Sequence, residues 1–599
     1  MKLAIKIDHE HYLDLYDNTT VTIELRNPAI FPDNPDIMPG SYSLPFRIPM
    51  TQNNARIFHH AHILASTPEF SFEFNGDIID SAPPIYRGKY CEIIYDGVPL
   101  IEGTAYFQKA DNTSGYLHVI IGKMPELKDI SLKDIDLGGV YDITEDDPDP
   151  VVHAKNTATD PDDYNHIFFP VFNSMFFNNV NPEQEDLPDL STQQAAKYHN
   201  FYANGSFRNL DDHLIATPFV KVNYILEKIF LHIDYHIKNE FNEEGELAGL
   251  CIYNNISIYT EDLEWGEEFL YNNHVPAIPA AKFVKELCKL FGLVVFSPPF
   301  IDGTATIKPI SDVLNSEPKK DWTKHSHHQY EVEFFDRPVK TLKFDPTYIE
   351  DLNFNFNFDN EFELPTDYTI VDNEDDFLNT TEDGYYFILT TNRFAYKLPN
   401  GEVGFSAFRM PPYVDPTIKR QSEYQIDMVP AVPVNVFDTI GGGFFRYIIP
   451  MVNNPGTFAP FDIASEPPLR LLLYRGMQKI EQSFGSDFEF PMASSNIYDI
   501  DETKIADQSL LWQGEEGLYN TFWKEWQYLL RYNKRVKRKY NLPLSEIINF
   551  NFDQLIHSNS QTYMVETMRI TLTPKGIKPV DTTMMQINTA FELKFEIAQ

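Results

Sequence analysis

The sequence predicts a mixed, β-rich protein of several domains, with an α+β domain in the middle of the chain. Three observations predict this class. Short strand-like runs separated by turn residues fill both ends of the chain. An amphipathic helical pattern followed by strand, turn and strand lies near the middle. The length of 599 residues is roughly four times that of an average domain.

Residues 1–141 are predicted to form a β-rich domain like a barrel or a sandwich. The strongest signal is a hairpin of residues 90–95 and 100–107 around Asp96-Gly97, because both turn residues tolerate a positive φ. A second hairpin returns through residues 116–121. Further strands are expected at residues 4–8, 12–16, 21–26 and 70–74, with room for one short helix within residues 53–64.

Residues 142–215 are predicted to be an acidic, Pro/Asp-rich linker or extended loop. The carboxylates of residues 144–163 are dense enough for a calcium site to be considered. Their spacing is not that of an EF-hand loop, however, and the prolines oppose the turn that such a loop needs. We therefore predict no metal site here.

Residues 216–345 are predicted to form the α+β domain. Thr217-Pro218 is typical of a helix start. Residues 278–291 form an amphipathic helical pattern that Gly292 ends. Strands are expected at residues 293–296 and 304–309, on either side of a turn at Asp302-Gly303.

The remaining chain divides into two further predicted units. Residues 346–505 are expected to be β-rich and loop-rich, and residues 352–359 alternate strictly between apolar and polar positions. Residues 506–599 are expected to hold one helix, residues 518–530, and closing strands around residues 562–573 and 584–597.

The composition indicates a folded and strongly acidic protein. Hydrophobic residues make up 43% of the chain and aromatic residues 14%, which is enough for packed cores. Lys and Arg number 48 against 88 Asp and Glu, so the formal net charge is −40. Such a charge argues against a nucleic-acid-binding protein of the basic type and against a protein that lies on an anionic membrane surface.

The cysteines and the hydropathy pattern indicate the cellular compartment in which the protein is made. Cys91, Cys251 and Cys288 lie in apolar settings and are expected to be buried thiols without a disulfide framework. The N-terminus becomes charged too early for a signal peptide. No apolar run reaches the roughly 18 residues needed to cross a bilayer. We expect a soluble protein, made in a reducing compartment and not inserted in a membrane.

One positive run interrupts the acidic chain at the end of the predicted C-terminal helix. Its cations are Arg531, Lys534, Arg535, Lys537, Arg538 and Lys539. Cation enrichment at a helix C-terminus, together with pairing to the chain's acids, is one interpretation. Contact with nucleic acid or with an acidic partner surface is the other. We therefore mark these residues as candidate contacts to another subunit or to an acidic partner.

The sequence offers no reactive constellation. There is no G-x-S-x-G element, and Gly441-Gly442-Gly443 lacks the Lys and Ser or Thr of a phosphate-binding loop. The histidine clusters at residues 59–62 and 325–328 lack the spacing of a zinc site. We predict no catalytic, cofactor-binding or metal-binding residues and no cofactor.

Several segments, taken in order, resemble a known family. They are "SYSLPFRIPMTQNN" (41–54), "YDGVPLIEGTAYF" (95–107), "TPFVKVNYILEKIFLHIDYHI" (217–237), "AAKFVKELCKLFGLVVF" (280–296), "LLWQGEEGLYNTFWKEW" (510–526) and "YMVETMRITLTPKGIKPV" (563–580). The ordered set is similar to tail hub and tail-tip (baseplate) structural proteins of tailed phages and prophages of Bacteroides-type bacteria.

The resemblance implies a virion structural protein that is synthesised in the cytoplasm of the bacterial host and located in the virion tail. Such a hub joins the tail tube to distal or receptor-binding parts and forms part of the DNA-ejection channel. Its partners would be further copies in a homo-oligomeric ring and the tube, tape-measure, receptor-binding or fibre proteins. DNA would pass transiently through the ring without specific binding.

Two other classes remain open at this point. A glycan-binding adhesion protein would also be rich in strands and aromatic residues, and a polysaccharide-degrading tail enzyme would need a carboxylate pair that sequence cannot single out among 88 acids. Some family hubs carry a cell-wall-degrading domain. The absence of a recognisable catalytic constellation argues here for a protein that is not an enzyme.

Overall fold

The protein was analysed as a computed structural model. The structure describes residues 2–29, 41–58, 71–74, 77–80, 88–121, 127–128, 130–143, 150–173, 198–203, 205–207, 216–258, 268–296, 303–334, 342–346, 368–391, 393–401, 403–409, 422–438, 445–452, 457–458, 467, 469–480, 488–499, 502–512, 514–532 and 534–587.

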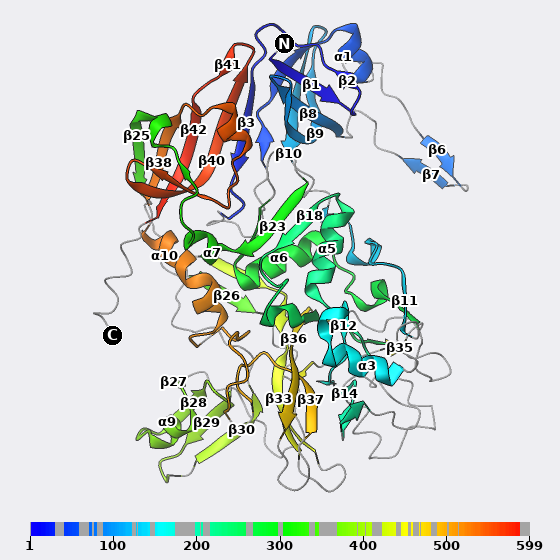
Figure 1. The fold of residues 1–599 in the computed structure, drawn as a ribbon, viewed down its shortest axis with the longest axis vertical. Helices are drawn as coiled ribbons and strands as arrows, with labels where there is room; N and C mark the ends of the chain where they lie inside the picture. The colour runs from blue at the N-terminus through cyan, green and yellow to red at the C-terminus, as the bar shows by residue number, and fades with distance from the viewer. Residues whose placement is uncertain are drawn as a thin grey trace.

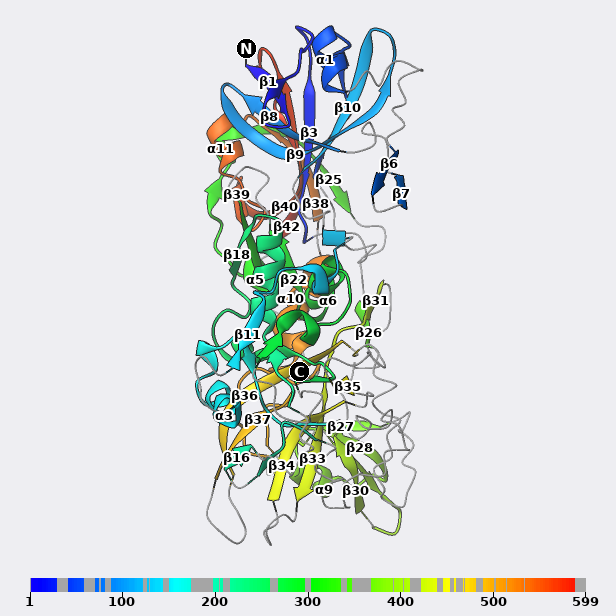
Figure 2. The ribbon, with the colours of Figure 1, turned by 90° about the vertical axis from the view of Figure 1, so that its right-hand side faces the viewer.

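The molecule is elongated and β-rich, and the expected mixed, multidomain class is confirmed (Figures 1 and 2). A large sheet occupies one end, helices α5 (Val222–His232) and α6 (Ala280–Phe291) lie in the middle, and smaller sheets occupy the other end. Among the described residues, no helix is long and apolar enough to span a membrane.

The large sheet has 15 strands, and its main path runs β2-β1-β8-β9-β10-β4-β3-β40-β42-β38-β25. Within the described strands this path is open and does not close into a barrel. Its N-terminal strands are β1 (Leu3–Ile7), β2 (His11–Tyr12), β3 (Val21–Arg26), β4 (Tyr42–Ser43), β5 (Phe46–Pro49), β8 (Lys89–Tyr95), β9 (Val98–Ala110) and β10 (Ser114–Ile121). The predicted hairpin turn is confirmed, with φ of 54° at Asp96 and 82° at Gly97.

The C-terminal part of the same sheet comes from two distant stretches of the chain. Its strands are β24 (Lys320–Asp321), β25 (Ser326–Phe334), β38 (Lys534–Tyr540), β39 (Leu555–Ser558), β40 (Gln561–Thr573), β41 (Gly576–Ile577) and β42 (Val580–Ile587). Strand β3 joins the two parts by pairing antiparallel with β40, from Val21 opposite Leu572 to Arg26 opposite Thr567. Residues at opposite ends of the sequence thus share one sheet, while the limits drawn above for the five units stay a prediction.

The middle of the chain holds the expected α+β element. Strands β18 (His236–Asn239), β23 (Thr304–Pro309) and β22 (Leu293–Phe296) form a three-stranded sheet in that order, and α6 ends at Gly292 with a φ of 57°. The expected helix start at Thr217-Pro218 is wrong, because β17 (Phe219–Val220) pairs there with β12 (His166–Ile167) and α5 begins at Val222.

The Pro/Asp-rich region also differs from expectation, since helix α3 (Pro150–Thr159) forms where the composition predicted a linker or loop. The helix buries His153, Ala154, Thr157 and Ala158. The Thr157 hydroxyl donates to the Ala154 carbonyl oxygen and accepts from the Phe168 amide, so this face of the helix is tied to the following segment. Burial of this helix face therefore stabilises a helix in spite of the Pro and Asp residues around it, which are typical of turns.

The far end of the molecule is built from small sheets. The larger one has the order β14-β13-β34-β33-β30-β29-β28-β27, and a second one contains β19, β36, β32 and β37. Their strands are β13 (Val171–Phe172), β14 (Tyr198–His199), β19 (Leu250–Ile252), β27 (Thr369–Val371), β28 (Gly384–Ile388), β29 (Arg393–Lys397), β30 (Val403–Arg409), β32 (Val429–Pro430), β33 (Val432–Asp438), β34 (Phe445–Met451), β36 (Arg470–Ile480) and β37 (Phe488–Ala493). The predicted strand at residues 352–359 lies outside the described residues.

The C-terminal helix starts as a π-helical turn, Tyr519–Trp523, and continues as α10 (Lys524–Tyr532). It packs on the middle unit, where Trp523 Nε1 donates to the Leu290 carbonyl oxygen at 3.2 Å. Other elements are α1 (Gln52–Ile57), β6 (Ser71–Phe74), β7 (Asp77–Asp80), β11 (Val140–Asp142), β15 (Tyr202–Ala203), β16 (Ser206–Phe207), β20 (Ile256–Ser257), β21 (Glu268–Leu270), α7 (Ile310–Leu314), β26 (Leu342–Pro346), α9 (Glu374–Asn379), β31 (Ser422–Ile426), β35 (Thr457–Phe458) and α11 (Leu544–Ile548).

Candidate functional site

The basic run forms a strand of the large sheet. Residues Lys534–Tyr540 are β38, which lies between β25 and β42, and only Arg531 belongs to the preceding helix α10. The interpretation as a basic helix end is therefore wrong for the run as a whole. Strand pairing places alternate residues on opposite faces, so the cations of β38 are divided between two environments.

On one face of β38, three cations meet carboxylates from three other strands of the same sheet. Arg535 binds Glu566 of β40 through Nε and Nη2 at 2.5 and 2.6 Å, and Lys539 lies 3.0 Å from Asp581 of β42. Lys537 pairs with Glu333 of the edge strand β25. The pairs of Lys537 and Lys539 are exposed and contribute little to stability, whereas the pair of Arg535 and Glu566 is largely enclosed. We call Arg535, Lys537, Lys539 and their three acids the charged face.

Glu566 is the most enclosed acid of the charged face. Burial raises the pKa of its carboxyl, and the ion pair with Arg535 opposes that rise without cancelling it. The charge of Arg535 therefore compensates a carboxylate that the fold has placed out of water.

The opposite face of β38 carries Arg538 among buried residues. Arg538 is only 9% exposed, and Val536 and Tyr540 lie on the same face. The Arg538 guanidinium carbon lies 4.8 Å from the ring centroid of Tyr330. Atoms Nε and Nη1 of Arg538 are buried and have no hydrogen-bond partner within the part of the chain that the structure describes. Tyr330 is itself 61% exposed, so it forms the outer cover of this guanidinium.

The joint between β3 and β40 contains a second ionic cluster, centred on Glu24. Its Oε1 accepts hydrogen bonds from Arg26 at 2.6 and 2.9 Å and from the Tyr42 hydroxyl at 3.0 Å. Its Oε2 accepts from Arg569 of β40 at 2.7 and 3.2 Å. Burial raises the pKa of Glu24, but the hydrogen bonds from Arg569, Arg26 and Tyr42 outweigh burial and lower the pKa overall.

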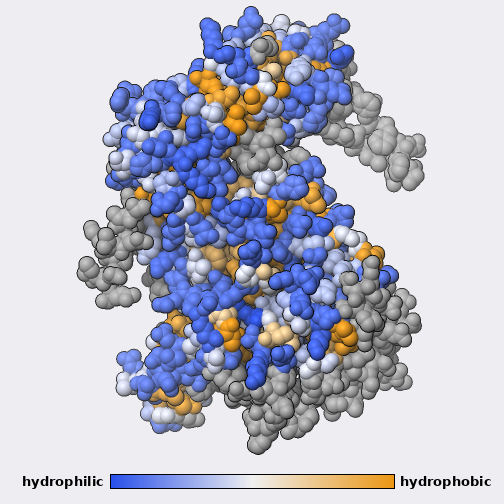
Figure 3. All heavy atoms as spheres, in the orientation of Figure 1, coloured by the Kyte–Doolittle hydropathy of each residue, from blue (hydrophilic) through white to orange (hydrophobic). Residues whose placement is uncertain are grey.

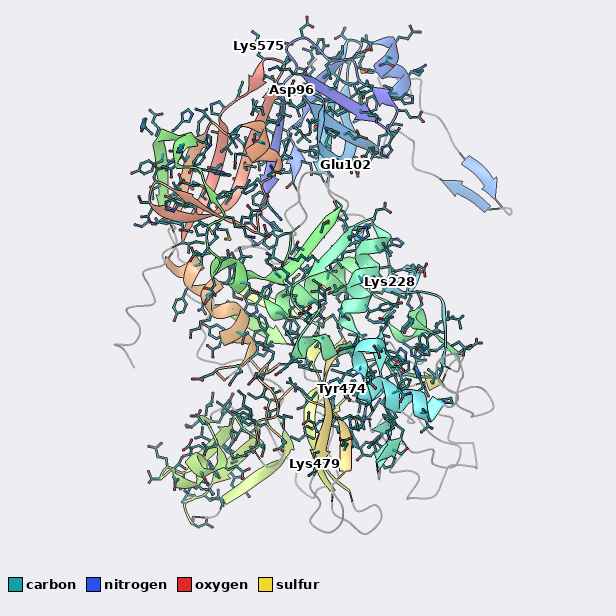
Figure 4. The ribbon with its side chains drawn as sticks, in the orientation of Figure 1. Asp96, Glu102, Lys228, Tyr474, Lys479 and Lys575 are labelled. Atoms are coloured by element: carbon teal, nitrogen blue, oxygen red, sulfur yellow. The ribbon has the colours of Figure 1, made fainter. Side chains whose placement is uncertain are left out.

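The two parts of the sheet also meet at the turn end. Asp96, in the β8–β9 turn, and Lys575, in the β40–β41 turn, lie at the same end of the sheet (Figure 4). The Tyr95 hydroxyl donates to the Thr573 carbonyl oxygen at 3.3 Å, so the strand ends that lead into the two turns are in contact. The joint is therefore held both in the middle of the strands and at their ends.

The histidine and carboxylate clusters of the sequence do not form a metal centre in the described part of the chain. His325, His327 and His328 lie at the start of β25, and the described residues contain no group of three potential ligands. The cluster at residues 59–62 and the acidic stretch 144–149 lie outside the described residues.

Buried histidines in the lower part of the molecule escaped the sequence reasoning. Nε2 of His153 lies 3.0 Å from Nε2 of His166, and Nδ1 of His166 lies 2.9 Å from the Tyr271 hydroxyl. Burial, with the neighbouring His153, lowers the pKa of His166 well below its usual value. Single histidines far apart in the sequence carry no signal for such a contact.

The surface seen in Figure 3 is mostly hydrophilic, with small hydrophobic patches between the elements. The groups described above offer ionic, hydrogen-bonding and aromatic contacts.

A period of two in the sequence could have revealed that residues 534–540 form a strand with two different faces. Val536, Arg538 and Tyr540 alternate there with Arg535, Lys537 and Lys539.

Comparisons with known proteins give the following. No family model matches the chain, and no curated protein matches it. Among solved structures, the chain is similar to the 43 kDa tail protein of prophage MuSo2 from Shewanella oneidensis, with a TM-score of 0.31, 8% identity, and coverage of 98% of this chain and 96% of that one.

Two further structures are similar at the same level. The tail protein from Neisseria meningitidis MC58 has a TM-score of 0.28 and 8% identity, and covers 98% of this chain and 96% of its own. Prophage tail protein gp18 from Listeria monocytogenes EGD-e has a TM-score of 0.31 and 6% identity, with coverage of 100% and 98%.

Proposed function

We propose that this chain is a structural protein of a phage tail. It acts as a hub or tail-tip/baseplate component that joins the tail tube to distal or receptor-binding parts. Copies form a homo-oligomeric ring, and the lumen of the ring is part of the DNA-ejection channel. Its partners are further copies and the tube, tape-measure and receptor-binding or fibre proteins, and its role is not enzymatic.

The observation that carries this proposal is the large sheet built from both ends of the chain. The segments that resemble the tail family near the two termini, residues 41–54, 95–107 and 563–580, contribute β4, β5, β8, β9, β40 and β41 of this one sheet. These three segments therefore belong to one structural unit, although the third lies more than 450 residues after the first two in the sequence.

The open form of the sheet favours assembly into a ring. Its main path ends in two different strands, β2 and β25. Two unlike ends allow a head-to-tail contact between identical copies, and such contacts close into a ring when the rotation between copies permits it.

The net charge supports a role beside passing DNA. With 88 acidic against 48 basic residues, a lumen with the average charge of this chain repels the phosphate backbone. DNA can then move through the ring without binding to its wall.

Antibody labelling of the phage particle tests the proposal. Antibodies raised against the purified chain and coupled to gold should label the distal end of the tail in electron micrographs, with antibodies against the tube protein as the control. Label on the capsid only, or a chain that is a stable monomer and cleaves glycans, would contradict it.

A further inference from the structure

Arg538 differs from three other cations of β38. Arg535, Lys537 and Lys539 each pair with a carboxylate within the chain. Arg538 points to the other face, where its guanidinium lies against the Tyr330 ring and beside the Tyr540 hydroxyl, and where Nε and Nη1 have no hydrogen-bond partner among the described residues. In a chain with a net charge of −40, a guanidinium to which the described residues bring no carboxylate is unexpected.

The cost of this arrangement points to a missing ligand. A buried charged donor without a partner is strongly unfavourable, because the group loses its water without gaining an acceptor. A cation–π contact with Tyr330 compensates only part of that loss. A carboxylate, which can accept two parallel hydrogen bonds from a guanidinium, compensates it best.

The guanidinium of Arg538 can be reached from outside the molecule, at the edge of the large sheet. Its cover, Tyr330, lies on β25, the last strand of the main path, and no other described strand pairs with the outer edge of β25. Tyr330 is 61% exposed, so rotation of this side chain uncovers the guanidinium at the rim of the sheet. A neighbouring chain that approaches the β25 edge meets this site.

We propose that Arg538 forms a carboxylate-binding site through which one copy of this chain binds an acidic side chain of a second copy. This inference rests on the proposed assembly of copies into a ring. Charge complementarity selects the occupant, because a second copy brings 88 acids to the one guanidinium of β38 for which the described residues supply no carboxylate.

Self-association of the full chain tests this site. Sedimentation velocity should show that Arg538→Met weakens self-association by about ten- to a hundredfold. Lys537→Met is the matched control, because Lys537 lies on the charged face of the same strand and already pairs with Glu333; it should change the association by about twofold at most. The melting temperature of Arg538→Met should not fall, since the variant removes an unpartnered buried charge.

A second variant locates the contact chemically. Arg538→Lys places a primary amine at this position, and a zero-length carbodiimide should join it to a carboxylate. A mixture of unlabelled copies and copies labelled with the heavy nitrogen isotope distinguishes cross-links between two copies from cross-links within one copy. Mass spectrometry should find the cross-link between copies.

Three results would overturn the inference. They are equal association of the wild type and Arg538→Met, links found only within single copies, and association of the wild type only after another tail protein is added. If the gold-coupled antibodies label the tail and any of these results is obtained, the carboxylate site is refuted but the proposed function is not.

Discussion

Glu24 shows how a single residue can hold together segments from opposite ends of a chain. Its carboxylate accepts hydrogen bonds from Arg26 and Tyr42 on the N-terminal side and from Arg569 on the C-terminal side. Only 8% of its side chain is exposed, so the ion pairs are shielded from solvent. Removing the charge leaves two guanidinium groups facing each other across the β3–β40 joint.

We expect Glu24→Gln to lower the free energy of unfolding by about 2–3 kcal/mol, because a buried acceptor of charged hydrogen bonds is lost. Chemical denaturation followed by circular dichroism measures the change. Glu268→Gln, at an exposed position of β21, is the control and should have little effect. An equal loss in both variants would show that the joint does not depend on this charge.

The same residue predicts a dependence on pH. Folding lowers the pKa of Glu24 below its usual 4.5, so its contribution to stability is present above about pH 4.5 and is lost as the pH falls through the lowered value. The stability difference between the wild type and Glu24→Gln should shrink as the pH drops from 5 towards 3, as thermal melts in that range would show. A difference that stays constant would contradict the assigned pKa.

At the level of elements, the sequence predicts those whose local signals agree with their packing. The amphipathic helix ending at Gly292 and the two strands that follow it appear as α6, β22 and β23, because periodicity, helix end and turn indicate the same structure. Strand β38 was missed because its Lys and Arg residues are poor strand formers. Its pairing depends on Glu333, Glu566 and Asp581, which lie on other strands.

The candidate site follows the same rule. The sequence identifies all six cations, but it does not tell which of them lack a carboxylate partner. That distinction depends on strand register, such as Tyr330 opposite Arg538, and on partners up to 204 residues away along the chain, as for Lys537 and Glu333. Helix α3 was missed for a similar reason, since its buried face is completed by residues outside the helix.

The end of α6 gives a prediction at this scale. Gly292 has a φ of 57°, and a Cβ atom there would lie 3.0 Å from the Phe522 carbonyl oxygen. We expect Gly292→Ala to cost about 1–2 kcal/mol in the free energy of unfolding, from the left-handed backbone and the close approach together. Gly303→Ala is the matched control, with a φ of 63° and a nearest atom 3.7 Å away, and it should cost less. Equal costs would show that the contact with Phe522 is unimportant.

For the whole molecule, the charge of −40 and the shared sheet are the features that the proposal connects. In the proposed assembly, the two unlike ends of the sheet meet between copies, and the acidic excess makes the proposed lumen repel DNA. The basic strand fits this scheme only if it lies at a contact between copies and away from the lumen. Arg535, Lys537 and Lys539 are already paired with carboxylates within the chain, whereas the proposal assigns Arg538 to the neighbouring copy.

Electron cryo-microscopy of the intact phage tail, at a resolution that shows side chains, tests this account most directly. We predict a ring of copies of this chain at the distal end of the tail, with Asp and Glu lining the lumen and β38 at the contact between neighbouring copies. A lumen lined mainly by Lys and Arg, or a tail without this chain, would contradict the account.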